Sequence, residues 1–173
     1  MPSRLLTFIS SGMVVYFLTG PVSLLAAQQE VNPVEINGDQ VEFIIEENKV
    51  VAEGNVSVIR DDVRLYCDKV TYDRDDQTAQ ATGHVVILRG DERLTGDEMT
   101  FDMGTMTGVF HNGKFFSNPF YGAGETIRRI DENHLVIDRG YITTSDYDDP
   151  EYRLYSSRVD VYPGDKATAR HVR

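Results

Sequence analysis

The sequence has 173 residues, a formal net charge of −11 at pH 7, one cysteine and no tryptophan. Nucleic-acid binding is not expected, because contacts to a phosphate backbone need clustered Lys and Arg rather than an acidic surface. Cys67 cannot form an internal disulfide, so we expect a small buried side chain, with an intermolecular disulfide in an oxidising compartment as the alternative.

Residues 1–27 predict an export signal. Arg4 precedes an apolar run from Leu5 to Leu18, and the small residues Ala26 and Ala27 close the segment. This order of charged, apolar and small residues is typical of a secretory signal peptide. We expect cleavage after Ala27. An uncleaved N-terminal anchor is the alternative, because Leu25 is large for its position and the whole run is long enough to span a bilayer.

The residues that follow repeat with a period of 29. Three pentapeptides share the pattern Asp-x-Val/Met-x-Phe/Tyr, at residues 39–43, 68–72 and 97–101. The pattern Ala-x-Gly-x-Val occupies residues 52–56 and 81–85, and Arg-Leu occupies residues 64–65 and 93–94. Three patterns in step at one period indicate stacked structural repeats.

Each repeat predicts two strands. Val41, Phe43 and Ile45 alternate with polar residues before a polar turn at 46–49, and a second strand covers residues 51–58 before a charged turn at 60–62. Such alternation between turn residues is the signal of half-buried strands. Gly54 and Gly83 fall inside strand patterns, where glycine predicts a β-bulge.

Beyond Gly108 the period loosens. Residues 117–124 are rich in turn formers and form the best internal boundary, and further strands are predicted at 124–129, 135–137 and 140–144. Residues 153–161 resemble residues 64–72 when aligned position by position, and we expect a further unit to begin there. We expect the chain to end within that unit.

These motifs resemble the OstA-like domain of bacterial lipopolysaccharide-transport proteins, from about Val34 to Val172. Residues 142–152 are similar to a Thr-Thr-Cys…Pro-x-Trp stretch in the N-terminal domain of the family's outer-membrane assembly protein. Ser145 stands in place of the cysteine and Tyr152 in place of the tryptophan. The first departure removes the disulfide that the resemblance would imply.

The resemblance implies an all-β fold, an open β-jellyroll whose antiparallel sheets are splayed like a V. Its parts would be a signal segment (1–27), OstA-like repeats (34–117) and a continuation of the same jellyroll (118–173). The resemblance also implies a periplasmic protein. Two locations stay open, free in the periplasm or associated with the outer membrane. Its ligand would be lipopolysaccharide or a related lipid, and its partners other jellyroll transport proteins.

Strand residues that alternate toward one side are the candidates to line a lipid groove. They are Val41, Phe43, Val56, Val58, Val70, Tyr72, Val85, Ile87, Met99 and Phe101. An inward apolar stripe is ordinarily just a packed core, which is the alternative here. An acyl chain of about twelve methylenes would gain roughly 10 kcal/mol in such a groove, at about 0.8 kcal/mol per methylene.

Neither catalysis nor a cofactor is expected. Asp39, Asp68 and Asp97 recur with the period, which is typical of structural turn residues. The four histidines lack metal-ligand spacing, and the acidic residues within 146–151 predict a solvated turn rather than a calcium site.

Three functional hypotheses follow. We favour a lipid-transport module, over a structural β-repeat scaffold of the cell envelope and over a β-helical enzyme acting on polysaccharide. Strands with unpaired backbone groups at 34–36 and 171–173 predict head-to-tail strand addition to a like-folded partner, or self-association.

Overall fold

The computed structural model describes residues 33–147 and 150–172. The predicted export signal lies outside these residues, as do Asp148 and Asp149 of the acidic turn. The described residues form β-strands, turns and one 3₁₀ turn, η1 (Ile45–Glu47), which confirms the all-β expectation. Among them, no helix is both long and apolar enough to cross a bilayer.

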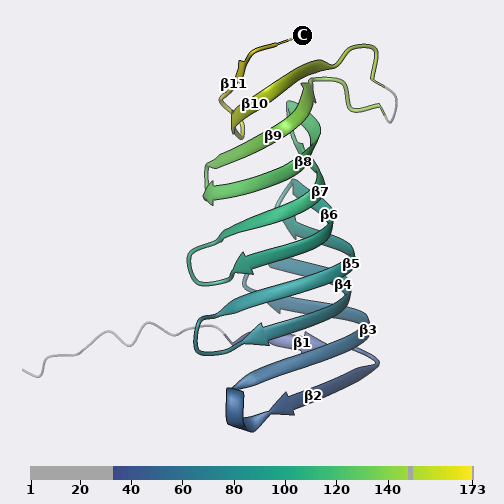
Figure 1. Ribbon diagram of the computed structural model, residues 1–173, viewed down its shortest axis with the longest axis vertical. Helices are drawn as coiled ribbons and strands as arrows, with labels where there is room; N and C mark the ends of the chain where they lie inside the picture. The colour runs from purple at the N-terminus through teal and green to yellow at the C-terminus, as the bar shows by residue number, and fades with distance from the viewer. Residues whose placement is uncertain (1–32, 148–149, 173) are drawn as a thin grey trace, which may run out of the picture. The chain divides into compact units, whose positions relative to one another are not determined.

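The strands form one antiparallel sheet in which nearly every strand pairs with its neighbour in sequence (Figure 1). They are β1 (Glu35–Asn37), β2 (Gln40–Ile44), β3 (Lys49–Arg60), β4 (Val63–Asp73), β5 (Thr78–Arg89), β6 (Glu92–Asp102), β7 (Thr107–Ser117), β8 (Phe120–Asp131), β9 (His134–Thr143), β10 (Leu154–Tyr162) and β11 (Lys166–Arg170). β1 and β2 both pair with β3, on its two halves, and β11 pairs with β10 alone. The sheet is therefore unclosed.

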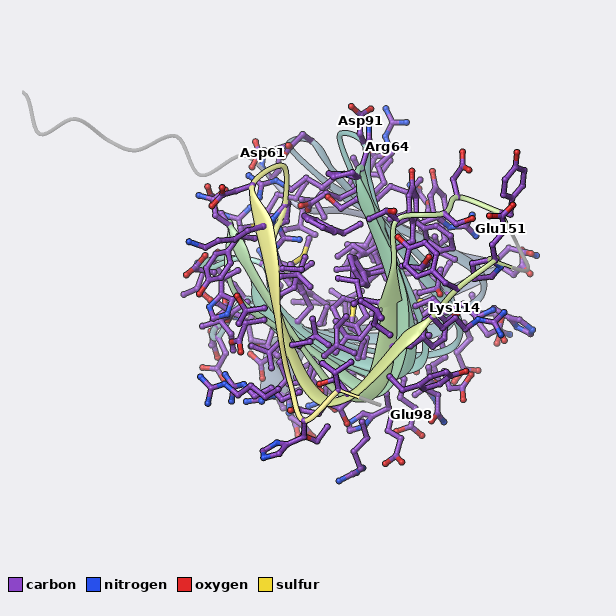
Figure 2. The ribbon with its side chains drawn as sticks, turned by 90° about the horizontal axis from the view of Figure 1, so that it is seen from above. Asp61, Arg64, Asp91, Glu98, Lys114 and Glu151 are labelled. Carbon is purple, nitrogen blue, oxygen red and sulfur yellow. The ribbon has the colours of Figure 1, made fainter. Side chains whose placement is uncertain are left out.

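The long strands bend midway, so that the sheet has two arms. Arm 1 is the half of the sheet in which Val50, Tyr72, Ala79 and Phe101 lie side by side as partners on successive strands. Arm 2 is the other half, in which Val58, Leu65, Ile87 and Leu94 are partners in the same way. Seen down the stack, the arms diverge from the bend with side chains between them, as in a V (Figure 2). The open side between the free ends of the arms is called the mouth here, and the turns of Asp61 and Asp91 lie at arm ends.

The bends confirm the predicted bulges. The register shifts between Glu53 and Val56 and between Thr82 and Val85, around Gly54 and Gly83. The residue after each glycine also has a positive φ, and this left-handed conformation turns the strand without ending it.

A polar ladder runs along the outside of the bends. At four bends, a positive-φ residue pairs with a carboxylate that precedes it in the chain: Asn55 with Asp39 (2.9 Å), His84 with Asp68 (2.8 Å), Asn112 with Asp97 (2.9 Å) and Arg139 with Glu125 (2.5 Å). The periodic aspartates are thus structural, but the expectation of turn positions is wrong for Asp68 and Asp97, which lie in mid-strand.

The bend at Arg139 also corrects the strand prediction near the C-terminus. The sequence predicts two strands at residues 135–137 and 140–144, yet β9 (His134–Thr143) runs from one into the other as a single bent strand. A left-handed residue followed by Gly140 resembles a strand break in the sequence but bends the chain within the ladder.

Apolar side chains from both arms meet inside the V. The largest fully buried ones are Phe101, Phe110 and Phe115, and the rings of Phe101 and Phe110 meet edge to face at 6.4 Å between centroids. Cys67 is buried in this core, as expected, and burial raises the pKa of its thiol to about 11.

Candidate functional site

The ten predicted groove residues share the inner face of the sheet. In arm 1, Val41 lies in register with Ala52 on the next strand, and the same line across the sheet contains Val70 and Met99. Phe43 lies in register with Val50, and that line contains Tyr72 and Phe101. Val56, Val58, Val85 and Ile87 occupy the inner face of arm 2.

Eight of these side chains are packed in the core, with at most 5% of their surface exposed. They are Val56, Val58, Val70, Tyr72, Val85, Ile87, Met99 and Phe101. In this conformation they touch one another and their neighbours rather than lining an open trough.

The inner face is exposed where the sheet ends. At the first edge, Val41 is 52% and Phe43 46% exposed, because no described strand lies beyond β2 to cover them. At the last edge, Leu154 is 45% exposed, and Ala167 and Ala169 of β11 are partly buried. One apolar face therefore extends from one edge of the sheet to the other.

Polar side chains join the two arms across the mouth. Arg129, near the end of arm 1, forms an ion pair of 2.8 Å with Glu92, at the end of arm 2. Arg89 of arm 2 lies 3.5 Å from Glu132, and Arg60 donates a 2.7 Å hydrogen bond to Gln77. We call these contacts the mouth clasp.

No motif in the sequence predicts the mouth clasp. Arg60 and Arg89 are 29 residues apart, and this spacing was the available signal. Their partners, Gln77 and Glu132, have no such relation to the repeat. A hollow of about 250 Å³ lies among the clasp residues, bordered by Asp62, Arg89, Gly90, Glu92, Arg129, Glu132 and Asn133.

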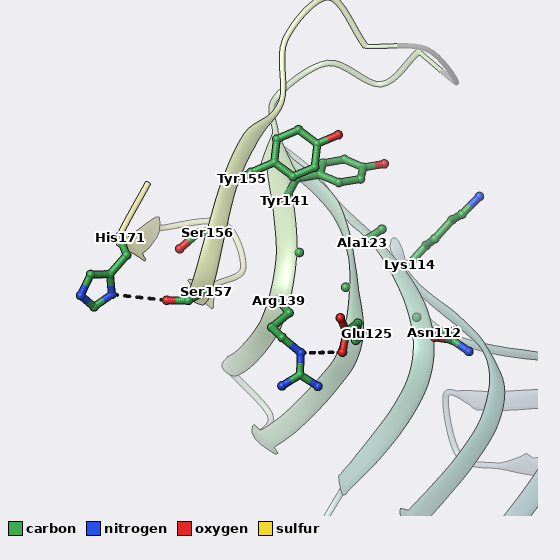
Figure 3. Close-up of a pocket in the computed structure, with 13 residues that line it drawn as sticks. Asn112, Lys114, Ala123, Glu125, Arg139, Tyr141, Tyr155, Ser156, Ser157 and His171 are labelled. Atoms are coloured by element: carbon green, nitrogen blue, oxygen red, sulfur yellow. Dashed lines mark hydrogen bonds and ion pairs between the residues drawn. The ribbon is translucent and has the colours of Figure 1, made fainter. Parts of the chain in front are cut away.

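A larger hollow, of about 710 Å³, follows the bends of β7 to β10 (Figure 3). Tyr141 and Tyr155 stand on one side with ring centroids 5.6 Å apart, and the Arg139–Glu125 pair lies on the other. Gly113, Gly124 and Gly140 add no side chains between them. None of the ten predicted groove residues borders this hollow.

A buried carboxylate stabilises the outer face of arm 1. Asp160 accepts hydrogen bonds from Arg158, and His134 Nε2 lies 3.0 Å from its Oδ1. These contacts, led by the Arg158 hydrogen bond, lower the pKa of Asp160 to about 2. These three residues lie in β9 and β10, beyond the part of the chain in which the 29-residue repeat is clear.

Comparison with known proteins gives one family and a shared fold. The model of a family described as OstA-like protein matches residues 27–118. The fold is similar to that of LptH from Pseudomonas aeruginosa, whose crystal structure is described as the LptA-homologous periplasmic component of the conserved lipopolysaccharide transport device. The two share 16% identity and a TM-score of 0.55 over 69% of this chain and 90% of that chain. No curated protein matches the sequence.

Proposed function

Because this chain belongs to the OstA-like protein family, we propose that it is a periplasmic module that binds lipopolysaccharide or a related lipid and passes it on during outer-membrane assembly. The observation that carries this proposal is the apolar inner face, which extends between the sheet edges and is exposed at both. The fold shared with the periplasmic LptH supports it.

In this mechanism the acyl chains lie between the arms, and the sugars remain in water. Each methylene moved from water to the interior contributes about 0.8 kcal/mol. Contacts of this kind have no direction, so a chain can slide from one set of side chains to the next without breaking a strong bond. The protein then acts as a carrier without chemistry, and no cofactor takes part.

Head-to-tail stacking would connect several such interiors. β2 and β1 form one edge of the sheet, and β11 forms the other. A partner strand added at either edge would pair the backbone and also cover the exposed inner residues, Val41 and Phe43 or Leu154. We propose like-folded transport proteins, or a second copy of this chain, as the partners.

A structural scaffold of the envelope is the second candidate. It is favoured by the packing of eight predicted groove residues, because a scaffold fills its interior with side chains. The two candidates differ in whether lipid reaches the interior in the cell.

Photo-crosslinking tests directly whether lipid reaches the interior. A photoreactive phenylalanine analogue at Phe43, which is half-exposed on the inner face, is expected to capture lipopolysaccharide in living cells. The same analogue at Glu42, the outward neighbour on β2, is the matched control. Phe101 and its outward neighbour Thr100 repeat the comparison in the core.

Capture at the outward positions alone, or at none, would contradict lipid transport and favour the scaffold. Mass spectrometry of lipid that co-purifies with the exported protein gives a second measurement, free of any substitution.

A further inference from the structure

We propose that the mouth clasp holds the arms together and that its release opens the interior to an acyl chain. The clasp is a property of the fold, whereas the identity of what enters rests on the proposed function. Arg129 and Glu92 are its central residues.

The register of the sheet shows that this pair crosses between the arms. Arg129 is in register with Gly108 and Phe101, on arm 1. Glu92 lies on the same strand as Phe101 but nine residues earlier, which is about 30 Å along an extended strand at about 3.3 Å per residue. A 2.8 Å contact between them is possible only because the arms fold toward each other.

Burial makes this pair the strongest part of the clasp. The side chain of Arg129 is 4% exposed and that of Glu92 19%. A second guanidinium nitrogen donates to the backbone oxygen of Glu132 at 2.8 Å. Removing one partner from such a pair leaves an uncompensated charge, which favours any conformation that returns the other partner to water.

The clasp is also imperfect. Nε of Arg129 is buried and has no hydrogen-bond partner among the described residues. A buried donor without a partner destabilises the closed conformation, because the same group would be hydrated if the mouth opened. The closed and open conformations are therefore closer in free energy than a fully satisfied network would make them.

The closed mouth covers the predicted groove. Beneath it, residues such as Val58 and Ile87 of arm 2 and Tyr72 of arm 1 are at most 5% exposed. An acyl chain can reach them through the mouth, which requires the arms to part, or from an exposed edge of the sheet. Of these two routes, the mouth is the one that the acyl chain takes.

The opening can be measured between spin labels at Asp91→Cys and Asn133→Cys, in the turns that flank the clasp. Every labelled variant also carries Cys67→Ala, because the native thiol is buried in the interior and would become accessible to the label when the mouth opens. Wild-type protein should give a short, narrow distance distribution. Glu92→Arg, which sets two cations together, should give a longer and broader one.

The exchange of both charges, Glu92→Arg with Arg129→Glu, should restore the short distance. Glu92→Gln keeps the size of the side chain, so it reports opening if the reversed charge prevents folding. Equal distance distributions in wild type, Glu92→Gln and Glu92→Arg would overturn the clasp.

A reversible lock tests the route. A short thiol-reactive linker with a cleavable disulfide, joined to the same two cysteines, should slow uptake of purified rough lipopolysaccharide severalfold, and a reductant should restore it. Equal uptake with and without the lock would overturn the mouth as the route and leave the proposed function standing. If no form takes up lipid while the distances still respond to Glu92→Arg, the proposed function fails and the clasp stands.

Discussion

Gly83 has a φ of +76°, a backbone conformation that other residues adopt only with strain. Asp68 on the neighbouring strand leaves no space for a side chain at this position. A Cβ there would lie 2.8 Å from Cβ of Asp68. Gly83→Ala should therefore destabilise the fold by about 1–3 kcal/mol, measured from urea unfolding. Gly90→Ala is the matched control, because Gly90 also has a positive φ but nothing within 4 Å. Gly90→Ala carries the backbone strain alone, so equal losses in both variants would show that the close approach of Asp68 adds no cost at the bend.

Asp160 gives the fold a dependence on acid. Its folded pKa of about 2 lies below the ordinary value of 3.8, so the carboxylate stabilises the folded protein above pH 4. This contribution, about 2 kcal/mol from the size of the shift, is lost as the pH falls from 4 to 2. Asp160→Asn should lower the free energy of unfolding at pH 7. The curves of the variant and the wild type should converge below pH 2, and a constant difference at every pH would contradict this origin.

At the scale of the strands, the repeat in the sequence predicts much of what forms. Alternation predicts the strands, and Gly54 and Gly83 predict the bulges, because these signals depend on neighbouring residues alone. These local signals do not show whether a strand lies at the edge or in the middle of the sheet. Phe43 and Tyr72 occupy the same place in the repeat, yet Phe43 is 46% exposed and Tyr72 is buried, since only one of them has strands on both sides.

The contacts between arms are harder to predict than the contacts between strands. Arg129 and Glu92 are separated by two strand pairings in the sheet, and neither belongs to a repeated pattern. Their meeting depends on how sharply each strand bends, which sums many small backbone rotations. The mouth clasp therefore emerges from the three-dimensional structure, whereas the inner apolar face can be predicted from the sequence.

At the scale of the whole described sheet, the exposed edges predict association. An inward-pointing charge at an edge is an effective barrier to strand addition. Phe43→Lys and Leu154→Lys should each weaken binding to a like-folded transport protein about tenfold, equivalent to about 1.4 kcal/mol, in sedimentation experiments. Gln40→Lys and Tyr155→Lys make the same change on the outer face and should have little effect. A protein that stays monomeric and binds no jellyroll would contradict the stacking.

The polar ladder along the bends has a consequence for size. Each of its contacts joins only neighbouring strands, such as Asp68 with His84, so a duplicated unit would bring its own bend and its own pair. Adjacent strands lie about 4.8 Å apart, and each unit of two strands therefore adds roughly 10 Å. Gene duplication or deletion of one unit would thus change the length of such a sheet in fixed steps, without a new kind of contact at the bends.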